Sequence, residues 1–183
     1  DAAAAEKKGI KVLNTPGATS VSVAELTLGL MLSVAREIPR ADRSLKAGKW
    51  EKKSFVGVEL FQKTLGLAGI GRIGEAVARR AAAFGMKIVA YDPHLNPDQI
   101  KSRGAEPVSF EDLLGRSDYI SFHLPLSQET RNMVSRDQIA RMKRGVVLIN
   151  CARGGVLDES ALLEALESGQ VRAAGLDVYS KEP

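Results

Sequence analysis

Cysteine and histidine are scarce in this sequence of 183 residues, which holds one cysteine, Cys151, and two histidines, His94 and His123. A single thiol cannot form an internal disulfide, which fits a reducing compartment. No apolar run approaches the 18 residues of a membrane-spanning helix, and no signal peptide is visible. We therefore expect a cytoplasmic protein without a membrane partner, and we expect no metal site.

Dense runs of charge of one sign are also missing. The net charge is only +4, the isoelectric point is about 9.3, and the lysines and arginines are scattered along the chain. We read them as a solvated surface and expect no nucleic-acid partner. The length suffices for one full-sized domain with a sizeable core, and 44% hydrophobic with 26% charged residues is ordinary for a globular protein.

The stretch from residue 63 to residue 92 organises the rest of the chain. An apolar strand leads into three glycines spaced G-x-G-x-x-G, a helix follows, and a second apolar strand ends in an acid 18 residues beyond the third glycine. The residues are Gly69, Gly71, Gly74 and Asp92. This strand–turn–helix–strand context is typical of a dinucleotide-binding site. A glycine-rich turn without a ligand is the alternative, but it leaves the position of the acid unexplained.

Each residue type in this stretch has a physical role. Gly69 permits a tight turn after the strand, Gly71 lets the backbone approach a pyrophosphate, and Gly74 lets the helix pack close to the strand. Backbone N–H groups at the start of the helix, including those of Arg72 and Ile73, can hold phosphate oxygens.

The acid at the end of the second strand indicates which cofactor is used. Asp92 can accept hydrogen bonds from ribose hydroxyls, and its charge would repel a 2′-phosphate. The following residues, Pro93 and His94, provide no arginine that would reverse this preference. The expected cofactor is therefore NAD rather than NADP.

Strands and helices alternate from residue 63 onward. Expected strands are Thr64–Ala68, Lys87–Tyr91, Glu106–Val108, Tyr119–His123, Val146–Asn150 and Ala173–Val178, and expected helices are Gly71–Phe84, Pro97–Arg103, Phe110–Arg116, Arg136–Met142 and Glu159–Ser168. Continuously apolar strands such as Val146–Ile149 require burial on both faces, which is typical of a parallel sheet. The expected fold class is therefore α/β, with a doubly wound parallel sheet of Rossmann type.

The residues before this region follow another pattern. We expect a helix end at 1–9, a short strand at Ile10–Leu13, a turn at Asn14–Gly17 and a connector with short strands at Trp50–Gln62. Between them, Ser22-Val-Ala-Glu25 predicts a capping box, and the helix that it opens is apolar almost all round. Pro39 is expected to kink or end that helix, with a polar continuation to Gly48.

Ligands of such sheets bind beyond the carboxyl ends of the strands, so three strand ends are candidate sites. The first carries His123, Pro125 and Thr130; the second carries Cys151, Ala152 and Arg153; the third carries Asp177, with Glu182 close behind. His123 is a candidate acid–base group, cofactor contact or structural histidine. Arg153 suits bidentate binding of a carboxylate, although a surface arginine in a turn is the alternative.

The residues at the third strand end give the weakest indication of a binding site. Asp177 could hydrogen-bond a nicotinamide carboxamide, and otherwise it is an exposed acid at the start of a loop. From position alone, Glu182 would be dismissed as part of a frayed terminus.

Taken together, these motifs resemble the D-isomer-specific 2-hydroxyacid dehydrogenases, and within them most closely the D-3-phosphoglycerate dehydrogenases. The matching stretches cover nearly the whole chain: Gly69–Gly74 with Asp92, Ser117–Pro125 with Thr130, Lys143–Gly155, and Gly175–Val178 with Glu182-Pro183. Ser22–Glu25 and residues 50–64 are similar to phosphoglycerate dehydrogenases in particular.

This resemblance implies hydride transfer between a D-2-hydroxy acid, such as the 3-phosphoglycerate of serine biosynthesis, and NAD. It implies that Arg153 binds the substrate carboxylate, that Glu182 raises the pKa of a catalytic histidine, and that Asp177 contacts the nicotinamide side. The family's histidine follows that glutamate, and neither His94 nor His123 replaces it, so this chain is expected to bind NAD without turnover.

The resemblance also divides the chain and leaves alternatives open. Residues 1–18 would be a remnant of a substrate domain, 19–62 a long interdomain and dimerisation helix (22–48) with its connector, and 63–183 an NAD-binding domain that is incomplete at its C-terminus. Thr19 replaces an asparagine that many members have near the substrate. Glyoxylate or hydroxypyruvate reductase is the near alternative; an NAD-sensing binding protein like the C-terminal-binding corepressors, or an engineered domain, are the others.

Overall fold

The structure is a computed structural model that describes residues 1–15 and 17–182. Pro16, in the expected 14–17 turn, and Pro183, in the Glu182-Pro183 motif, lie outside the described residues. One six-stranded sheet has the order β3-β2-β1-β4-β5-β6, and every neighbouring pair is parallel. Its strands are β1 Thr64–Ala68, β2 Lys87–Tyr91, β3 Glu106–Pro107, β4 Tyr119–Phe122, β5 Val146–Asn150 and β6 Val171–Leu176. The expected doubly wound α/β fold is confirmed.

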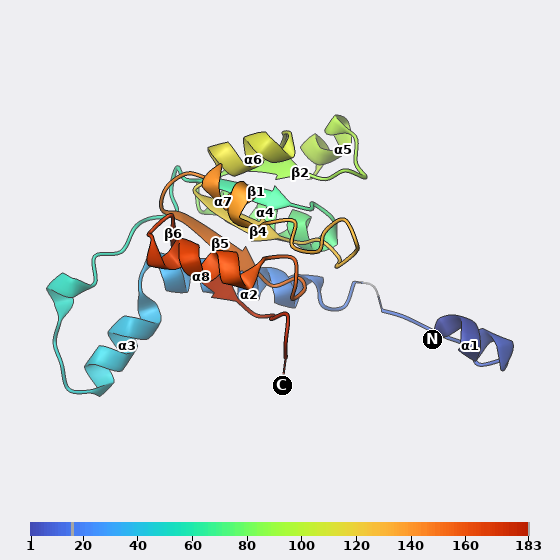
Figure 1. The fold of residues 1–183 in the computed structure, drawn as a ribbon, viewed down its shortest axis with the longest axis horizontal. Helices are drawn as coiled ribbons and strands as arrows, with labels where there is room; N and C mark the ends of the chain where they lie inside the picture. The colour runs from blue at the N-terminus through green and yellow to red at the C-terminus, as the bar shows by residue number, and fades with distance from the viewer. Residues whose placement is uncertain (16, 183) are drawn as a thin grey trace.

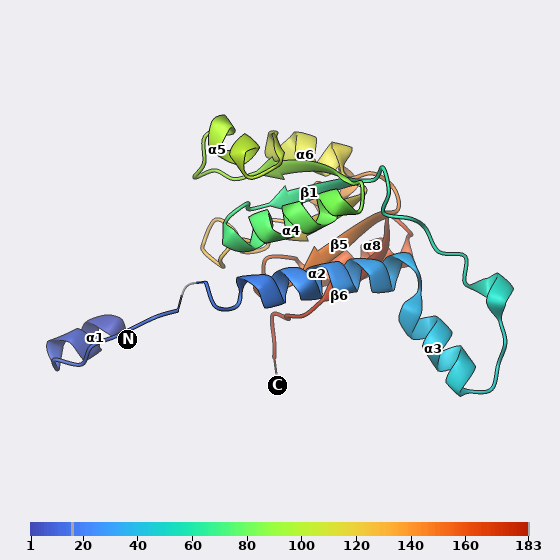
Figure 2. The same cartoon turned by 180° about the vertical axis from the view of Figure 1, so that it is seen from behind.

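Helices cover both faces of this sheet (Figures 1 and 2). They are α1 Ala2–Lys7, α2 Ser20–Ala35, α3 Ile38–Lys46, the 3-10 helix η1 Lys52–Ser54, α4 Arg72–Ala83, α5 Pro97–Ser102, α6 Phe110–Arg116, α7 Arg136–Ala140 and α8 Glu159–Glu167. One apolar core lies under α2 and α4, and a second lies under α6, α7 and α8. Alternate residues of β5 enter the two cores: Val147 and Ile149 face the first, and Val146 and Leu148 face the second.

The chain before β1 departs from the sequence-based expectation in several places. Residues 10–13 form no strand, because no strand of the described residues lies beside them to accept their hydrogen bonds. The capping box at Ser22 is also wrong: α2 begins at Ser20 behind Thr19, which makes no side-chain cap. Glu25 instead lies on the outside of the helix, 3.6 Å from Arg80 of α4.

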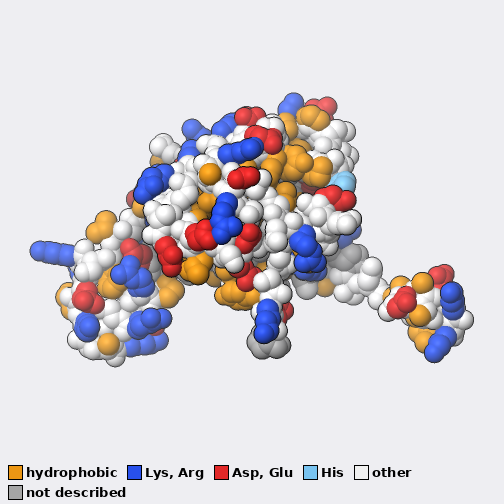
Figure 3. Space-filling model, viewed as in Figure 1, with side chains coloured by type: hydrophobic (Ala, Val, Ile, Leu, Met, Phe, Trp, Pro, Cys, Tyr) orange, Lys and Arg blue, Asp and Glu red, His pale blue; other side chains and the backbone are white. Residues whose placement is uncertain are grey.

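The break after α2 precedes the proline that was expected to cause it. Glu37 adopts a left-handed conformation, with φ of 53°, and Pro39 lies in the first turn of α3, where its missing N–H costs no hydrogen bond. The connector that follows contains η1 and no strand. α1 and α3 project from the body at opposite ends (Figure 1), and basic, acidic and apolar side chains are interspersed on the face in Figure 3.

Smaller corrections concern element ends. β6 begins at Val171, opposite Val146, and ends at Leu176, two residues earlier at each end than expected. β3 and β4 each stop one residue sooner than expected, and α7 ends at Ala140. Among the described residues, no helix is both long enough and apolar enough to cross a membrane.

Candidate functional site

The turn between β1 and α4 requires its glycines. Gly69 has φ of +90°, and a Cβ atom there would lie 2.7 Å from the carbonyl oxygen of His123. A Cβ on Gly74 would lie 2.4 Å from the carbonyl oxygen of Gly69, so the helix can approach the strand only without a side chain at this position. The expected geometric roles of Gly69 and Gly74 are therefore confirmed.

Gly71 differs because a Cβ atom there would meet no heavy atom within 4 Å. It is the N-cap residue of α4 and offers no side-chain cap to the first turn, which begins at Arg72 and Ile73. The first N–H groups of a helix have no acceptor within the helix, and the helix dipole makes this end positive. An open space at Gly71, next to those donors, fits an anionic ligand.

Asp92 is held against this turn by two backbone groups. Its Oδ2 accepts a hydrogen bond of 3.0 Å from the N–H of Ile70, and its Oδ1 accepts one of 3.0 Å from the N–H of His94. Arg103 also donates to the carbonyl oxygen of Ile70. The carboxylate, which is only half-buried, is thus fixed between the ends of β1 and β2.

A hollow of about 520 Å³ opens beside Asp92. Apolar side chains of Leu95, Ile100 and Val108 line it, and Glu106 and Arg116 form a bidentate pair at 2.9 Å among its lining residues. A planar apolar group next to a carboxylate would suit this hollow, as in sites that bind a nucleoside.

The loop after β4 brings His123 against the glycine turn. Its Nε2 lies 2.9 Å from the hydroxyl of Ser121, while Nδ1 is buried and has no hydrogen-bond partner among the described residues. Burial lowers the pKa of His123 to about 4, so the imidazole is neutral near pH 7. A buried orphan nitrogen is uncommon in proteins and marks this side chain as one that could meet a bound group.

Pro125 and Thr130 shape the rest of this loop. The Thr130 hydroxyl donates to the carbonyl oxygen of Pro125 at 2.7 Å and accepts from the N–H of Ser127 at 2.7 Å. Pro125 itself is exposed. The threonine therefore closes the loop, and its side-chain hydrogen bonds are made within the protein.

The turn after β5 is organised by Asn150, which is 2% exposed. Its side chain donates to the carbonyl oxygen of Arg153 and accepts from the N–H of Ala152, both at 3.0 Å. Arg153 is exposed, and its guanidinium donates to the carbonyl oxygen of Ala152. A Cβ on Gly154 would lie 1.8 Å from the carbonyl oxygen of Tyr179, so this turn presses against the segment after β6.

That segment carries the last two candidates. Asp177 is exposed, and its N–H donates to the carbonyl oxygen of Asn150 at 3.0 Å. Glu182 accepts from the N–H of Tyr179 at 3.3 Å. Cys151, by contrast, is 6% exposed and contacts Thr27 of α2. Burial raises the pKa of its thiol, the Thr27 hydrogen bond opposes the rise, and Asp177 adds to it.

The structure thus places the expected residues at the carboxyl ends of β1, β2, β4, β5 and β6, along one edge of the sheet (Figure 1). Sequence reasoning assigned no role to Asn150, Ser121 or Arg103, although each bonds to a candidate residue or to the glycine turn. Asn150 could have been found, because a single amide at the end of the run Val146–Ile149 needs partners when buried. The contacts of Arg103 depend on folding and have no local signal.

Comparison with known proteins decides the family. A sequence model described as "D-isomer specific 2-hydroxyacid dehydrogenase, NAD binding domain" matches residues 28–183. The chain belongs to this family. NAD is therefore the cofactor of the domain, as expected from Asp92.

Among relatives of this dehydrogenase domain, a D-3-phosphoglycerate dehydrogenase of Methanocaldococcus jannaschii is 53% identical, and a hydroxypyruvate reductase of Thermotoga maritima is 56% identical. Both matches cover 100% of this chain, but they cover 35% and 59% of those proteins, so the chain spans about a third to three fifths of its relatives.

Solved structures of the family agree with this fold. A glyoxylate reductase from Paecilomyes thermophila matches with a TM-score of 0.90 and 42% identity, over 100% of this chain and 56% of that one. A D-lactate dehydrogenase from Aquifex aeolicus, in complex with NAD and lactic acid, matches with a TM-score of 0.86 and 38% identity, over 99% and 54%.

Proposed function

We propose that this chain supplies the NAD-binding part of a dehydrogenase that acts on the CH–OH group of a D-2-hydroxy acid. The observation that carries the proposal is the fixed position of Asp92, which is bonded to the N–H of Ile70 beside the open space at Gly71. A carboxylate held beside the N-terminal turn of a helix suits the ribose and the pyrophosphate of one dinucleotide.

The proposed cofactor contacts run along the carboxyl edge of the sheet. The first turn of α4, at Arg72 and Ile73, receives the pyrophosphate, Asp92 receives the adenine ribose, and the apolar hollow beside it receives the adenine. The other end of the cofactor lies against the remaining candidates, which are His123, Pro125, Thr130, Cys151, Ala152 and Asp177. For Cys151 we propose a backbone contact, because its thiol is buried against α2.

Arg153 and Glu182 are the proposed catalytic residues. The Arg153 guanidinium is exposed and lies on the turn that packs against the segment carrying Glu182. Such a guanidinium can bind the carboxylate of a 2-hydroxy acid with two parallel hydrogen bonds. A glutamate beside a histidine favours the charged imidazole and so raises its pKa, which would suit an acid–base pair in the parent protein.

NAD, when bound, would accept the hydride from C2 of the substrate. The proton of the hydroxyl needs a separate base, and neither histidine of this chain suits that role. His123 is bonded to Ser121 and has a pKa of about 4, and the exposed His94 is tied through its N–H to Asp92, the proposed ribose contact. We therefore propose that the 183-residue chain binds NAD without turning over.

For the parent protein, the proposed substrate is 3-phosphoglycerate, with hydroxypyruvate or glyoxylate as the second candidate. The names of the relatives support both, because a phosphoglycerate dehydrogenase and a hydroxypyruvate reductase match at 53% and 56% identity. Substrate screening of a full-length protein separates the two, since only one of them carries a phosphate.

We also propose the division into residues 1–18, 19–62 and 63–183, with a homodimer formed through residues 22–48. One side of α2 packs on α4 and the sheet, at Ala24, Leu28 and Met31, while Val21 and Leu26 remain exposed. Exposed apolar side chains on a helix that is buried on its other side suit a contact with a second copy.

A calorimetric titration with NADH tests the proposed function. The Asp92→Ala variant should weaken binding about tenfold or more, because it removes a charged hydrogen-bond acceptor. Asp98→Ala is the matched control, since this exposed carboxylate of α5 forms a surface ion pair, 3.6 Å from Lys101. Equal affinities of the two variants would contradict the assignment of Asp92, and turnover of 3-phosphoglycerate well above background would contradict the proposed inactivity.

A further inference from the structure

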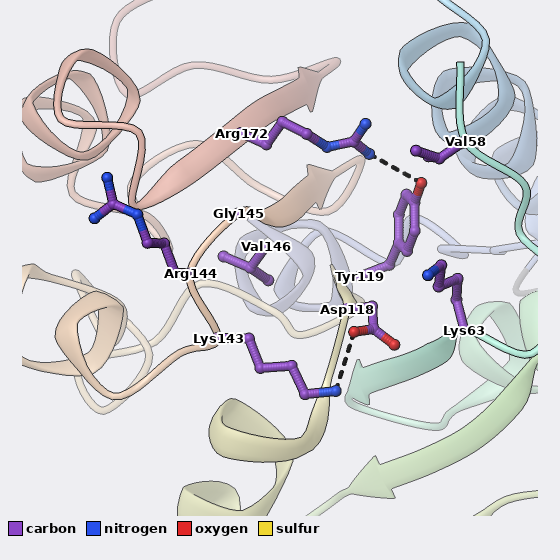
Figure 4. A pocket seen from close by; sticks show the side chains of 9 residues that line it. All are labelled: Val58, Lys63, Asp118, Tyr119, Lys143, Arg144, Gly145, Val146 and Arg172. Carbon is purple, nitrogen blue, oxygen red and sulfur yellow. Dashed lines mark hydrogen bonds and ion pairs between the residues drawn. The ribbon is translucent and has the colours of Figure 1, made fainter. Parts of the chain in front are cut away.

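A second pocket lies at the opposite edge of the sheet, where β1, β4, β5 and β6 begin. Figure 4 shows it from close by, and its volume is about 160 Å³. The lining residues that matter for its chemistry are Lys63, Asp118, Tyr119, Lys143, Gly145 and Arg172. Each stands just before or at the start of a strand, so the pocket is built by the sheet order itself.

Positive charge dominates this pocket. Its lining holds a single carboxylate, that of Asp118, and four cationic side chains, those of Lys63, Lys143, Arg144 and Arg172 (Figure 4). That carboxylate already accepts hydrogen bonds from the N–H of Thr64 at 2.8 Å and from Lys143 at 3.0 Å. Burial acts to raise the pKa of Asp118, but these two donors and the charge of Lys63 outweigh it and lower the pKa. The one negative charge of the pocket is thus paired with Lys143 and attracted to Lys63.

Lys63 and Arg172 keep the capacity to bind a further acceptor. Lys63 is attracted to Asp118 only at longer range, and Figure 4 draws no hydrogen bond or ion pair from it to another lining residue. Arg172 donates one N–H to the Tyr119 hydroxyl at 3.1 Å, and a guanidinium has five. Arg144 is different: its side chain points away from the others and donates to the carbonyl oxygen of Ser168.

Tyr119 adds a neutral donor to these charges. The residue is 2% exposed and lines the pocket, and its hydroxyl oxygen accepts a hydrogen bond from Arg172. Because that oxygen acts as the acceptor, the O–H hydrogen is left to be donated. Burial raises the pKa of Tyr119, against the opposing effect of Arg172, so the hydroxyl keeps its proton near neutral pH.

The pocket is small, and the backbone at Gly145 leaves open space in it. Gly145 has φ of +81°, and a Cβ atom there would meet nothing within 4 Å. The volume is below the roughly 300–1,000 Å³ that is typical of pockets for drug-sized ligands. A nucleotide would therefore be too large, whereas a group with several acceptor oxygens and two negative charges matches both the size and the donors.

We propose that this pocket binds a phosphate group, held by Lys63, Arg172 and the Tyr119 hydroxyl at the amino edge of the sheet. The group is either free inorganic phosphate or the phosphate of a small phosphomonoester. It binds at the edge of the sheet opposite to the glycine turn, so the proposal does not depend on the cofactor contacts.

The proposal is tested by titrating the ¹⁵N-labelled 183-residue chain with inorganic phosphate and recording NMR spectra. A titration with sodium chloride at equal ionic strength is the reference. We expect saturable shifts at residues 63, 118–119, 143–146 and 172. The Arg172→Met variant should weaken binding about tenfold, because a charge-assisted hydrogen bond is lost. Tyr119→Phe should weaken it less, and it keeps the volume of the buried ring.

Lys87→Met is the matched control, since Lys87 begins β2 at the same edge but does not line the pocket. Its affinity for phosphate should equal that of the unchanged chain. A second titration with glycerol 3-phosphate distinguishes the two sources, because tighter binding than phosphate indicates a phosphomonoester. Shifts that do not saturate, that chloride reproduces, or that survive both Arg172→Met and Tyr119→Phe would overturn the proposal.

Discussion

Two substitutions in the glycine turn separate the stability of the fold from the affinity for the cofactor. Gly74→Ala places a methyl group between two backbone segments, whereas Gly71→Ala places one in open space at the start of α4. The same chemical change, three residues apart, should therefore have opposite consequences for folding and binding.

The size of each effect follows from the geometry. At Gly74 the added Cβ would lie 2.4 Å from the carbonyl oxygen of Gly69, so the helix or the turn must shift. Overpacking of this kind costs about 1–3 kcal/mol, which lowers the melting temperature of a domain of this size by about 2–12 °C. At Gly71, φ is −67° and no atom is near, so we expect the free energy of unfolding to change by less than about 1 kcal/mol.

The affinity for NADH should be lowered by Gly71→Ala, the substitution that has little effect on stability. The methyl group of Gly71→Ala would occupy the space in which the pyrophosphate is proposed to approach the backbone, and we expect the affinity for NADH to fall at least about tenfold, or about 1.4 kcal/mol. Thermal unfolding followed by circular dichroism and calorimetric titration with NADH measure the two quantities on the same samples. The reasoning is refuted if Gly71→Ala is as destabilising as Gly74→Ala, or if it binds NADH as tightly as the unchanged chain.

Two further predictions concern the pKa of His123 and the packing of the hydrophobic core. The folded chain keeps His123 neutral down to about pH 4, while an unfolded histidine protonates near pH 6.5, so the free energy of unfolding should fall by about 3 kcal/mol between these pH values. Urea unfolding at pH 7.5 and 4.5 should show a smaller fall in His123→Asn; an unchanged fall would contradict the pKa. Leu148→Ala, in the fully buried β5, should cost about 2–5 kcal/mol in urea unfolding, and the exposed Leu163→Ala on α8 should cost far less.

The sequence predicts this fold well where periodicity and burial agree. Strands such as Val146–Asn150 are apolar at every position because both faces of the sheet are covered, and such a run has few other interpretations. In the turn at Gly69–Gly74, two of the three glycines are required by the backbone: Gly74 by the carbonyl oxygen of Gly69, and Gly69 by that of His123, just after the neighbouring strand β4.

Expectations failed where the outcome depends on distant partners. Residues 10–13 have a strand-like composition, but a strand exists only when another strand accepts its hydrogen bonds. Ser22 and Glu25 have the spacing of a capping box, yet α2 already begins two residues before Ser22, and Glu25 faces Arg80 of α4. In both cases the outcome was decided by contacts with residues far along the chain, which a short stretch of sequence does not reveal.

The two edges of the sheet show that functional sites, like local elements, can be predicted from sequence only where they do not depend on distant partners. At the carboxyl edge, most candidate residues follow a strand that could be recognised, so the rule that ligands bind beyond strand ends was enough to select them as candidates, whereas Glu182 was selected only through the family resemblance. At the amino edge, Lys63, Asp118, Lys143 and Arg172 come from four separate strand starts, and none is unusual alone. They meet only because the order β1-β4-β5-β6 places those strands side by side. A pocket made by crossovers can therefore be inferred only after the sheet order is known.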